Sequence, residues 1–369
     1  MKIPLIKPFI TDEVKKAVLK VLDSGFLTEG EQTWALEAAV KQYIGCKYAI
    51  AVCNCTVGLE LALRALNIGP GDEVIVPDYT YPATASVVNI VGADIVLVDI
   101  DQKNMLIDYN LIEQAITERT KAIIPVSIFG NPLDYNKLLD IKNRYNLYLI
   151  EDAACSIGAM SNGKPVGNLA DISVFSLHPR KFITTGEGGI ITTDNTKLAE
   201  WMNSYKHFGM DTDTTRVSTD FIRIGTNSKM SNLQAAVGLV QMKHIEELLE
   251  KRRMLAQNYF SLLLSCNMIA FPEILKDGAH SFQSFCLFVD NRNQIIKKMR
   301  GYGIETQIGT YSLHMHSAFN DNKKCFIKNR LKESEYAFNH CLTLPMYHDM
   351  SQKEQEFVTH TLMKLIENG

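Results

Sequence analysis

The feature that most constrains the fold is an alternation of short apolar runs with amphipathic runs between residues 48 and 151. The expected strands are 48–53, 73–77, 94–100, 121–129 and 147–151, and the expected helices are 56–66, 83–91, 109–117 and 135–145. Continuous β-branched strands separated by helices are typical of a mostly parallel sheet that is covered on both faces. The sequence therefore predicts an α/β fold whose alternating block ends at about residue 245.

The length of 369 residues is large for a single core, so we expect a large domain and a smaller one. Near the N-terminus, Thr11 is suited to begin a helix that ends at Gly25. Toward the C-terminus the pattern is helix, then short strands over 281–289, then helix. We expect a large domain over residues 1–245, and a small C-terminal α+β domain over residues 246–369 with the N-terminal helix packed on it.

One lysine stands where a later strand pattern breaks. Lys181 follows an apolar run and precedes Gly186, Gly188 and Gly189, after which a second strand is expected over 190–193. A lysine at the edge of a buried sheet can be partly desolvated, which lowers its pKa and makes the amine available for a Schiff base. The alternative is a solvated turn residue beside hairpin glycines.

A possible phosphate site lies at Thr56, where the first predicted strand turns into a helix. The start of a helix offers free backbone N–H groups and the positive end of a dipole, and Thr56 adds a hydroxyl. The alternative is that Thr56 is a plain helix cap. The turn lacks the glycine patterns of dinucleotide-binding folds and of NTPases, so neither class is supported.

Two further places lie at the expected carboxyl ends of strands, where α/β proteins hold their ligands. Glu151 and Asp152 form an acidic pair, of which one carboxylate could pair with a cationic ring nitrogen. Tyr79 and Tyr81 follow the strand 74–77 and could stack on a flat ligand. The alternatives are a helix-capping or surface acid and ordinary loop packing.

The composition excludes several classes of protein. Apolar residues make up 46% and charged residues 21%, as in soluble globular proteins, and the net charge of −3 favours neither nucleic acid nor an acidic membrane as partner. No apolar run approaches the ~20 residues of a membrane span. The eight scattered cysteines form no zinc motif, and no signal peptide precedes the first helix. We therefore expect reduced thiols, no metal and a cytoplasmic protein.

Taken in order, these motifs resemble the sugar aminotransferases of the DegT/DnrJ/EryC1/StrS family, within the fold-type-I aspartate aminotransferase superfamily. The resemblance covers nearly the whole chain. The matching motifs are Ser24–Gly30, Asn54–Thr56, Val76–Tyr81, Val98–Asp101, Ile150–Ala154, Phe175–Lys181, Thr184–Gly189 and Gly225–Ser231. The most specific of them is the lysine that stands just before the run Thr-Thr-Gly-Glu-Gly-Gly.

The resemblance implies the cofactor and the groups on its ring. Lys181 is expected to form the internal aldimine with pyridoxal 5′-phosphate (PLP). Asp152 is expected to pair with the pyridinium nitrogen and keep it protonated, so that the ring accepts electrons. Tyr81 is expected to stack on one face of the ring.

The resemblance also implies how the phosphate is held and how the protein assembles. Thr56, the Val57 amide and Ser176 are expected to hold the phosphate. Asn227 lies in a segment that family members extend into a neighbouring subunit, where it touches the phosphate. We therefore expect a homodimer with shared active sites.

The sequence departs from the commoner family pattern at five positions. Cys55 and Gly58 stand where Gly and Ala are usual, Cys155 replaces Gln, Glu or His, Ser127 replaces His, and Lys229 replaces Arg. Positions 155, 127 and 229 lie near or behind the site in relatives, so Cys155 is expected to touch the cofactor and Lys229 the substrate. These departures leave the cofactor assignment intact and put the identity of the substrate in doubt.

By resemblance, the expected reaction moves an amino group from L-glutamate to a nucleotide-linked keto sugar, at C4 of a 4-keto-6-deoxy sugar, with ping-pong kinetics. His314 lies in a segment near the substrate entrance of relatives and is expected to contact the sugar or pyrophosphate, or else to be an ordinary packed or exposed histidine. One alternative is a PLP-dependent dehydratase, but such relatives carry histidine in place of the lysine, so Lys181 favours transamination. The other is a non-catalytic sensor with an attached DNA-binding segment, for which the N-terminus here is too short.

Overall fold

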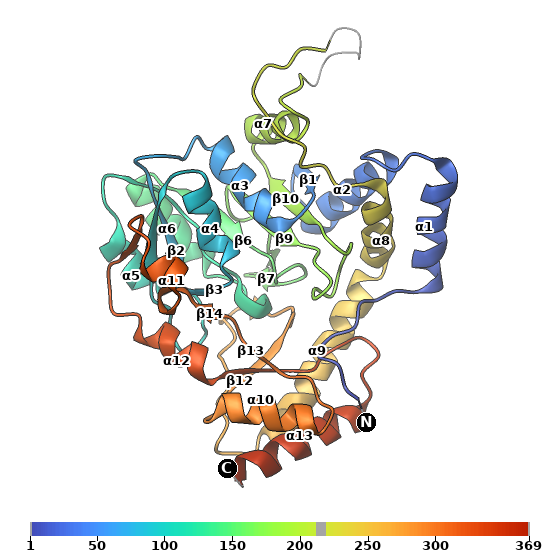
Figure 1. The fold of residues 1–369 in the computed structure, drawn as a ribbon, viewed down its shortest axis with the longest axis vertical. Helices are drawn as coiled ribbons and strands as arrows, with labels where there is room; N and C mark the ends of the chain where they lie inside the picture. Colours follow the sequence, from blue (N-terminus) through green and yellow to red (C-terminus); the bar gives the residue numbers. More distant parts are fainter. Residues whose placement is uncertain (1, 212–218, 368–369) are drawn as a thin grey trace.

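A large sheet forms the middle of the computed structural model, which describes residues 2–211 and 219–367 (Figure 1). Among these residues the sheet has eight strands. From one edge to the other they are β1 (Tyr48–Val52), β10 (Gly189–Thr193), β9 (Ile172–Ser176), β6 (Tyr148–Asp152), β5 (Thr120–Ile123), β2 (Glu73–Pro77), β4 (Asp94–Val98) and β15 (Cys325–Ile327). Neighbouring strands are parallel except at β10, which runs antiparallel to β1 and β9. The predicted mostly parallel α/β sheet is confirmed.

One strand is shorter than the sequence predicted. The expected strand 121–129 ends at Ile123 in β5, and residues Ile128–Gly130 form a short 3₁₀ turn, η1. Pro125 has no N–H to donate to a sheet, and the chain turns after it. Because the chain turns early, Ser127 lies beside the end of β6, the neighbouring strand. The Ser127 N–H donates to the Asp152 carbonyl at 3.2 Å.

Side chains alternate along each strand, so both faces of the sheet carry apolar side chains. Helices cover both faces and bury these side chains. Val96 and Val98 of β4 pack in one core, and Ile95 and Leu97 pack in the other. The core that contains Val96 includes α2 (Glu31–Ile44), α5 (Tyr109–Ala115), α6 (Tyr135–Tyr145) and α8 (Asn232–Lys243). The core that contains Ile95 includes α3 (Cys55–Ala65), α4 (Ala83–Ile90) and α7 (Thr196–Lys206). Each fully buried aliphatic side chain contributes about 1.5–3 kcal/mol to this packing.

The helix ends follow the sequence signals. Helix α1 (Asp12–Ser24) begins after Thr11, whose Oγ1 accepts the Val14 N–H at 3.3 Å, and it ends at Gly25 with a φ of 71°. Helix α8 begins after Ser231, which exchanges hydrogen bonds with Gln234. The predicted start and end of α1 are confirmed, and α1 packs against α8, a helix within residues 1–245.

The C-terminal part builds a separate core, called the second core from here on, in addition to the two layers that flank the large sheet. Strands β12 (Phe285–Phe288), β16 (Cys341–Leu344) and β13 (Gln307–Ile308) form an antiparallel sheet, with α10 (Arg292–Gly301), α12 (Lys332–His340) and α13 (Gln352–Glu367) nearby. Helix α9 (Ile245–Leu263) joins the two parts, because Leu248 lies in the core of the large sheet and Tyr259 in the second core (Figure 1). Ile3 belongs to the second core as well and bridges Ile304.

The chain after α9 is shared between the two parts. Residues 311–327 return to the large sheet: β14 (Tyr311–Ser312) pairs with β3 (Tyr79–Thr80), α11 (Ser317–Asn320) follows, and β15 extends the large sheet beside β4. The division at residues 245 and 246 stays a prediction. Within the described residues, no helix combines the length and the apolar character needed to cross a membrane.

The polar segment 206–226 lies beyond α7, at one end of the molecule (Figure 1). Its middle, residues 212–218, lies outside the described residues. The flanks pair with each other, since the Asp211 N–H donates to the Asp220 carbonyl and the Ile222 N–H to the Gly209 carbonyl, both at 2.9 Å.

Candidate active site

The structure brings the predicted lysine and acid together at the carboxyl edge of the large sheet. Asp152 is the last residue of β6, and Lys181 follows β9, the strand beside it. Cys55 lies within electrostatic reach of both, and Cys155 lies within reach of Lys181. Carboxyl ends of neighbouring parallel strands meet at one edge of a sheet, which is why residues almost thirty positions apart become neighbours.

The Lys181 amine is buried and contacts a cysteine. Its Nζ donates to Cys155 Sγ at 2.9 Å, and its backbone N–H donates to the His178 carbonyl at 2.8 Å. Burial acts to lower the pKa of Lys181, but Cys155, with Cys55 and Asp152 behind it, raises that pKa above its ordinary value. The expectation of a lowered pKa is therefore wrong for the free amine, because Cys155 in direct contact, together with the more distant Cys55 and Asp152, outweighs desolvation.

The Asp152 carboxyl is also buried, and two donors hold it. Oδ2 accepts the Thr84 hydroxyl at 2.7 Å, and Oδ1 accepts the Ala154 N–H at 3.1 Å. Burial raises the pKa of Asp152, while these two donors and the Lys181 charge act against that rise. The carboxyl is therefore neither a helix cap nor a surface acid.

Its neighbour Glu151 has a different role, because adjacent residues of a strand face opposite sides of the sheet. The buried Glu151 carboxyl accepts the hydroxyls of Ser127 and Ser173, the latter at 2.8 Å. Burial raises the pKa of Glu151. Ser127 thus lies behind the site, bonded to Glu151.

The start of α3 is capped by Asn54. Its Oδ1 accepts the Val57 N–H at 2.9 Å, so Thr56 is not the cap and its hydroxyl is left half-buried in the first turn. Gly189 lies against this turn so closely that a Cβ there would be 2.7 Å from the carbonyl carbon of Asn54. The glycine therefore permits β10 to approach α3, which is more than hairpin chemistry. Ser176, at the end of β9, is half-buried.

Tyr81 and His314 occupy two adjacent strand connections. Tyr81 is 64% exposed, and its ring centroid lies 6.2 Å from that of Tyr311. His314 is held by the buried Asp78, which accepts its N–H and its Nδ1, both at 2.8 Å, as well as the Ser312 hydroxyl at 2.6 Å. This contact raises the pKa of His314.

Asn227 and Lys229 lie beside the strand that leads into α3. The Ser228 carbonyl between them accepts the Cys53 N–H at 2.9 Å. Asn227 is exposed, whereas Lys229 is half-buried with its Nζ 4.9 Å from the centroid of the Phe208 ring. Burial lowers the pKa of Lys229.

Sequence reasoning missed two of the groups that shape this site. Asn54 carries a signal that could have found it, since Asn is a favoured cap just before a helical run. Thr84 carries none, because a threonine in the first turn of α4 does not reveal that its hydroxyl meets an aspartate 68 positions away.

A buried amine within electrostatic reach of a buried carboxyl, close to the start of a helix, defines the class. It is an α/β enzyme equipped for amine–carbonyl chemistry on a ligand that carries a phosphate.

The chain belongs to the DegT/DnrJ/EryC1/StrS aminotransferase family, whose sequence model matches residues 8–363. A UDP-4-amino-4-deoxy-L-arabinose–oxoglutarate aminotransferase of Shewanella sediminis is 33% identical over 99% of this chain and 98% of its own length. The Streptococcus pneumoniae protein Spr1654, assigned as a sugar aminotransferase, has a TM-score of 0.93 at 29% identity in its PMP form, over 100% of this chain and 98% of its own. Helicobacter pylori PseC, an aminotransferase of pseudoaminic acid biosynthesis, has a TM-score of 0.93 at 25% identity, over the full length of both chains. The predicted family and fold type are confirmed, and the protein is a PLP-dependent aminotransferase.

The residues of the site fit PLP. The Lys181 amine suits its aldehyde, the buried Asp152 carboxyl suits a ring nitrogen that must stay protonated, and the start of α3 suits its phosphate. The absence of a side chain at Gly189 keeps that helix start clear.

Proposed function

We propose that this enzyme moves the amino group of L-glutamate to a nucleotide-linked keto sugar, with Lys181 as the amine that binds PLP. The observation that carries the proposal is the buried Lys181 amine, 2.9 Å from Cys155 Sγ and within reach of the Asp152 charge. The name of the Shewanella relative pairs a 4-amino nucleotide sugar with oxoglutarate, which supports glutamate as donor and C4 as the aminated carbon. The family resemblance supports a 4-keto-6-deoxy sugar as acceptor.

The groups around Lys181 have separate tasks in this proposal. Bound PLP supplies an electron-withdrawing ring. Asp152 pairs with the ring nitrogen and is held as an acceptor by Thr84 and Ala154. The exposed Tyr81 is free to cover one face of the ring.

The phosphate is assigned to Thr56, Ser176 and the Val57 amide. Thr56 and Ser176 are each half-buried residues at the edge of the site, and the Ser176 hydroxyl accepts the His178 N–H at 3.3 Å. The Val57 N–H already donates to Asn54, so it must be shared with the phosphate or released to it. His314 and Lys229 are assigned to the nucleotide sugar, whose phosphates suit cationic partners.

Lys181 is also proposed to move the proton. With PLP bound, the neutral Lys181 amine would be the base that takes the proton from the substrate carbon and holds it at Nζ. Both substrates use the same amine, so ping-pong kinetics are expected.

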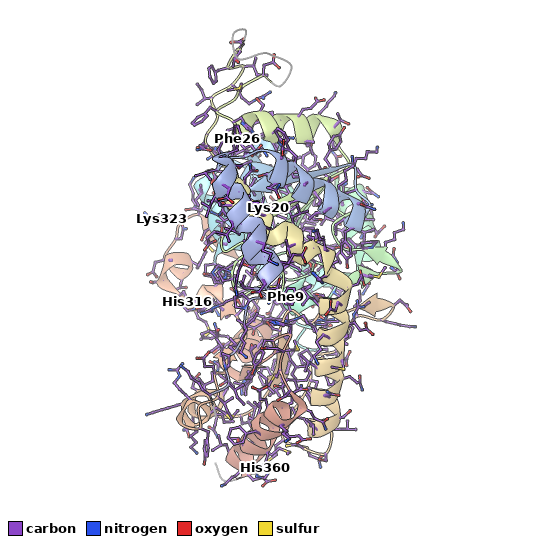
Figure 2. All side chains as sticks on the ribbon, turned by 90° about the vertical axis from the view of Figure 1, so that its right-hand side faces the viewer. Phe9, Lys20, Phe26, His316, Lys323 and His360 are labelled. Carbon is purple, nitrogen blue, oxygen red and sulfur yellow. The ribbon has the colours of Figure 1, made fainter. Side chains whose placement is uncertain are left out.

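We further propose a homodimer in which Asn227 of one subunit reaches the phosphate of the other. Asn227 itself is exposed. The paired flanks of the loop before it carry large exposed apolar side chains, with Ile224 at 94%, Phe221 at 59% and Ile222 at 51% exposure. Phe26, on the connection between α1 and α2, is 78% exposed at the same end of the molecule (Figure 2). Such apolar surfaces mark interaction sites.

The cytoplasm is the proposed location. All eight cysteines are free thiols in the structure, which suits a reducing compartment.

The first test is the visible absorption spectrum of the purified protein with PLP, before and after L-glutamate. We expect a band of bound PLP that glutamate converts to the pyridoxamine phosphate spectrum. Lys181→Ala should lack the band given by the protein and PLP alone. Lys142→Ala is the matched control, because Lys142 pairs with Asp171 away from the site. A wild-type protein without the band, or an unaltered band in Lys181→Ala, would overturn the proposal.

The second test separates transamination from dehydration and examines the dimer. With a panel of nucleotide-linked keto sugars, 2-oxoglutarate should form in step with an amino sugar, whereas a dehydratase would yield a deoxygenated sugar without net amino transfer. Mixing Lys181→Ala with Asn227→Ala should restore activity if two subunits share each site. Mixtures that stay inactive, with subunit exchange shown by mass, would refute the shared site.

A further inference from the structure

The side chain of Gln283 spans the two peptide groups that flank Lys181. Its Nε2 donates to the Arg180 carbonyl at 2.7 Å, and its Oε1 accepts the Phe182 N–H at 3.1 Å. The pattern copies the pairing of one strand with another, and Gln283 is only 6% exposed. One side chain therefore fixes the backbone from which the Lys181 side chain extends.

Gln283 is in turn held by a buried arginine of α9. Arg252 donates from Nη2 to the Gln283 carbonyl at 2.6 Å and from Nε to the Phe282 carbonyl at 2.7 Å. Its guanidinium also lies 5.3 Å from the centroid of the Phe182 ring. Among the described residues no carboxylate pairs with Arg252, and burial lowers its pKa to about 9. Burying a cation that bonds only to carbonyls costs folding free energy. We therefore infer that Arg252 is placed here to hold the backbone of Phe282 and Gln283.

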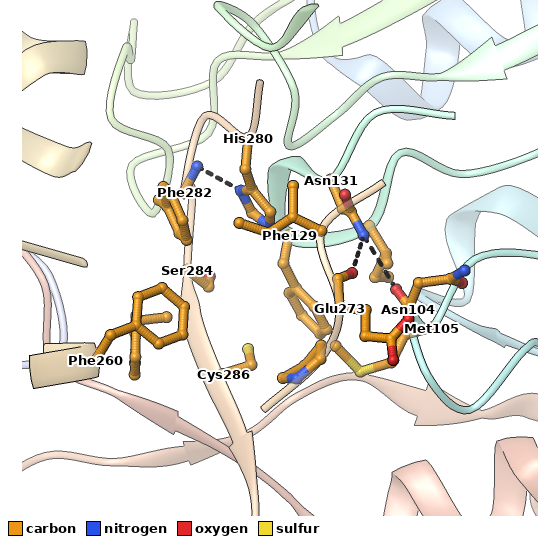
Figure 3. A pocket seen from close by; sticks show the side chains of 14 residues that line it. Asn104, Met105, Phe129, Asn131, Phe260, Glu273, His280, Phe282, Ser284 and Cys286 are labelled. Atoms are coloured by element: carbon orange, nitrogen blue, oxygen red, sulfur yellow. Dashed lines mark hydrogen bonds between the residues drawn. The ribbon is translucent and has the colours of Figure 1, made fainter. Parts of the chain in front are cut away.

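The backbone around Gln283 is strained and closely packed. Phe282 has a φ of 50°, a region that non-glycine residues seldom occupy, and its N–H donates to His280 Nδ1 at 2.8 Å (Figure 3). The cavity behind this segment has a volume of about 20 Å³, room for about one water. The strained conformation is therefore held by its surroundings.

The segment 281–283 also holds Cys155, the residue whose Sγ contacts the Lys181 amine. The Ser281 hydroxyl donates to the Cys155 carbonyl at 3.2 Å, and Cys155 Sγ is the group that contacts Lys181 Nζ. A Cβ at Gly130 would lie 2.3 Å from Ser281 Oγ and 3.1 Å from the Cys155 carbonyl oxygen. Residues 281–283 thus fix both members of the Lys181–Cys155 contact from one side.

We propose that Gln283 is a positioning residue that sets the place of the Lys181 amine, with Arg252 holding Gln283 in register. The segment leads directly into β12, so the core built by the C-terminal strands fixes the lysine of the large sheet. The inference rests on the proposed role of Lys181. A displacement of about 1 Å at a reacting group lowers a rate about 100-fold.

The test replaces Gln283 by methionine, which keeps the length and removes both hydrogen bonds. Gln355→Met is the matched control, because Gln355 is fully buried and donates to the Leu255 carbonyl at 2.8 Å in the second core. We expect Gln283→Met to lower kcat by about 10- to 100-fold with a smaller change in KM, and to shift the absorption maximum of bound PLP. The control should leave both unchanged.

Two measurements keep the inference testable if Gln283→Met folds poorly or turnover cannot be followed. In the cofactor-free protein, amide hydrogen exchange at Phe182 should be faster in Gln283→Met than in Gln355→Met. In Gln283→Glu, the ionised carboxylate cannot donate to the Arg180 carbonyl but the protonated acid can. The activity of Gln283→Glu relative to wild type should therefore rise as the pH falls.

Unchanged kcat and unchanged Phe182 exchange in Gln283→Met would overturn the inference. So would a fall in kcat that Gln355→Met reproduces. A wild-type protein without the PLP band would overturn the proposed function instead, and Phe182 exchange would still decide whether Gln283 fixes this backbone.

Discussion

The Thr84 hydroxyl is expected to help keep Asp152 ionised, and Thr84→Val tests this expectation. The Thr84 hydroxyl has one hydrogen, and its shortest contact is Asp152 Oδ2 at 2.7 Å, while Thr80 Oγ1 lies 2.9 Å away and the Tyr81 carbonyl oxygen 3.1 Å away. Valine has nearly the same shape but cannot donate. The carboxylate would keep only the Ala154 N–H as a donor, at 3.1 Å.

The size of the change in the Asp152 pKa follows from the loss of one hydrogen bond to a buried carboxylate. A hydrogen bond to a charged group contributes about 1.5–3 kcal/mol, which corresponds to a factor of roughly 10 to 150 in an equilibrium. The variant should therefore lower the ratio of ionised to protonated Asp152 by that factor. Because burial already raises the pKa of Asp152, a further rise brings its protonation closer to neutral pH.

The direction of the change in the Asp152 pKa determines which measurement tests it. Protonated Asp152 cannot pair as an anion with a ring nitrogen, so activity falls as the pH drops through the pKa of this group. The acid limb of the pH–kcat profile should move to higher pH in Thr84→Val. The loss of folding stability should be larger near neutral pH than in acid, because a carboxyl with a raised folded-state pKa favours folding below that pKa.

Thr359→Val provides the matched control, since Thr359 is 2% exposed in α13 and donates to the Gln355 carbonyl at 3.0 Å. The acid limb of the pH–kcat profile of Thr359→Val should coincide with that of the wild type. If the acid limb of folded Thr84→Val also coincides with the wild type, Thr84 does not control the charge of Asp152.

Two further predictions concern the turn and the thiol of the site. Gly189→Ala should lower the free energy of unfolding by about 1–3 kcal/mol and weaken PLP binding, measured by urea denaturation and by titration, because the new Cβ would meet the backbone of α3 at 2.7 Å. Gly301→Ala, where nothing lies within 4 Å, should change stability by less than about 1 kcal/mol, and equal effects would show that the approach at 189 is not tight. Cys155→Ala removes a group that raises the pKa of Lys181, so an amine-reactive reagent should modify this lysine in the cofactor-free protein at lower pH than in the wild type. Cys266→Ala should leave that pH dependence unchanged, and the same result for Cys155→Ala would contradict the role of the thiol.

The sequence by itself determined the features that depend on near neighbours in the chain. The β-branched runs and helical spacings predicted the parallel sheet, and the side chains of Val96 and Leu97 lie in opposite cores as alternation requires. Thr11 and Gly25 marked the ends of α1 correctly. The ordered motifs around Lys181 identified the family, because such motifs preserve local chemistry.

Only the tertiary structure decided the contacts that control the reacting groups. Thr84 meets Asp152 across 68 positions and Gln283 meets Phe182 across 101, and the Cys155 contact reversed the expected direction of the Lys181 pKa. Residue spacing determines which face of a helix or strand a side chain occupies. It does not determine how closely two separate elements approach, and hydrogen bonds and pKa shifts depend on that distance to within a fraction of an ångström.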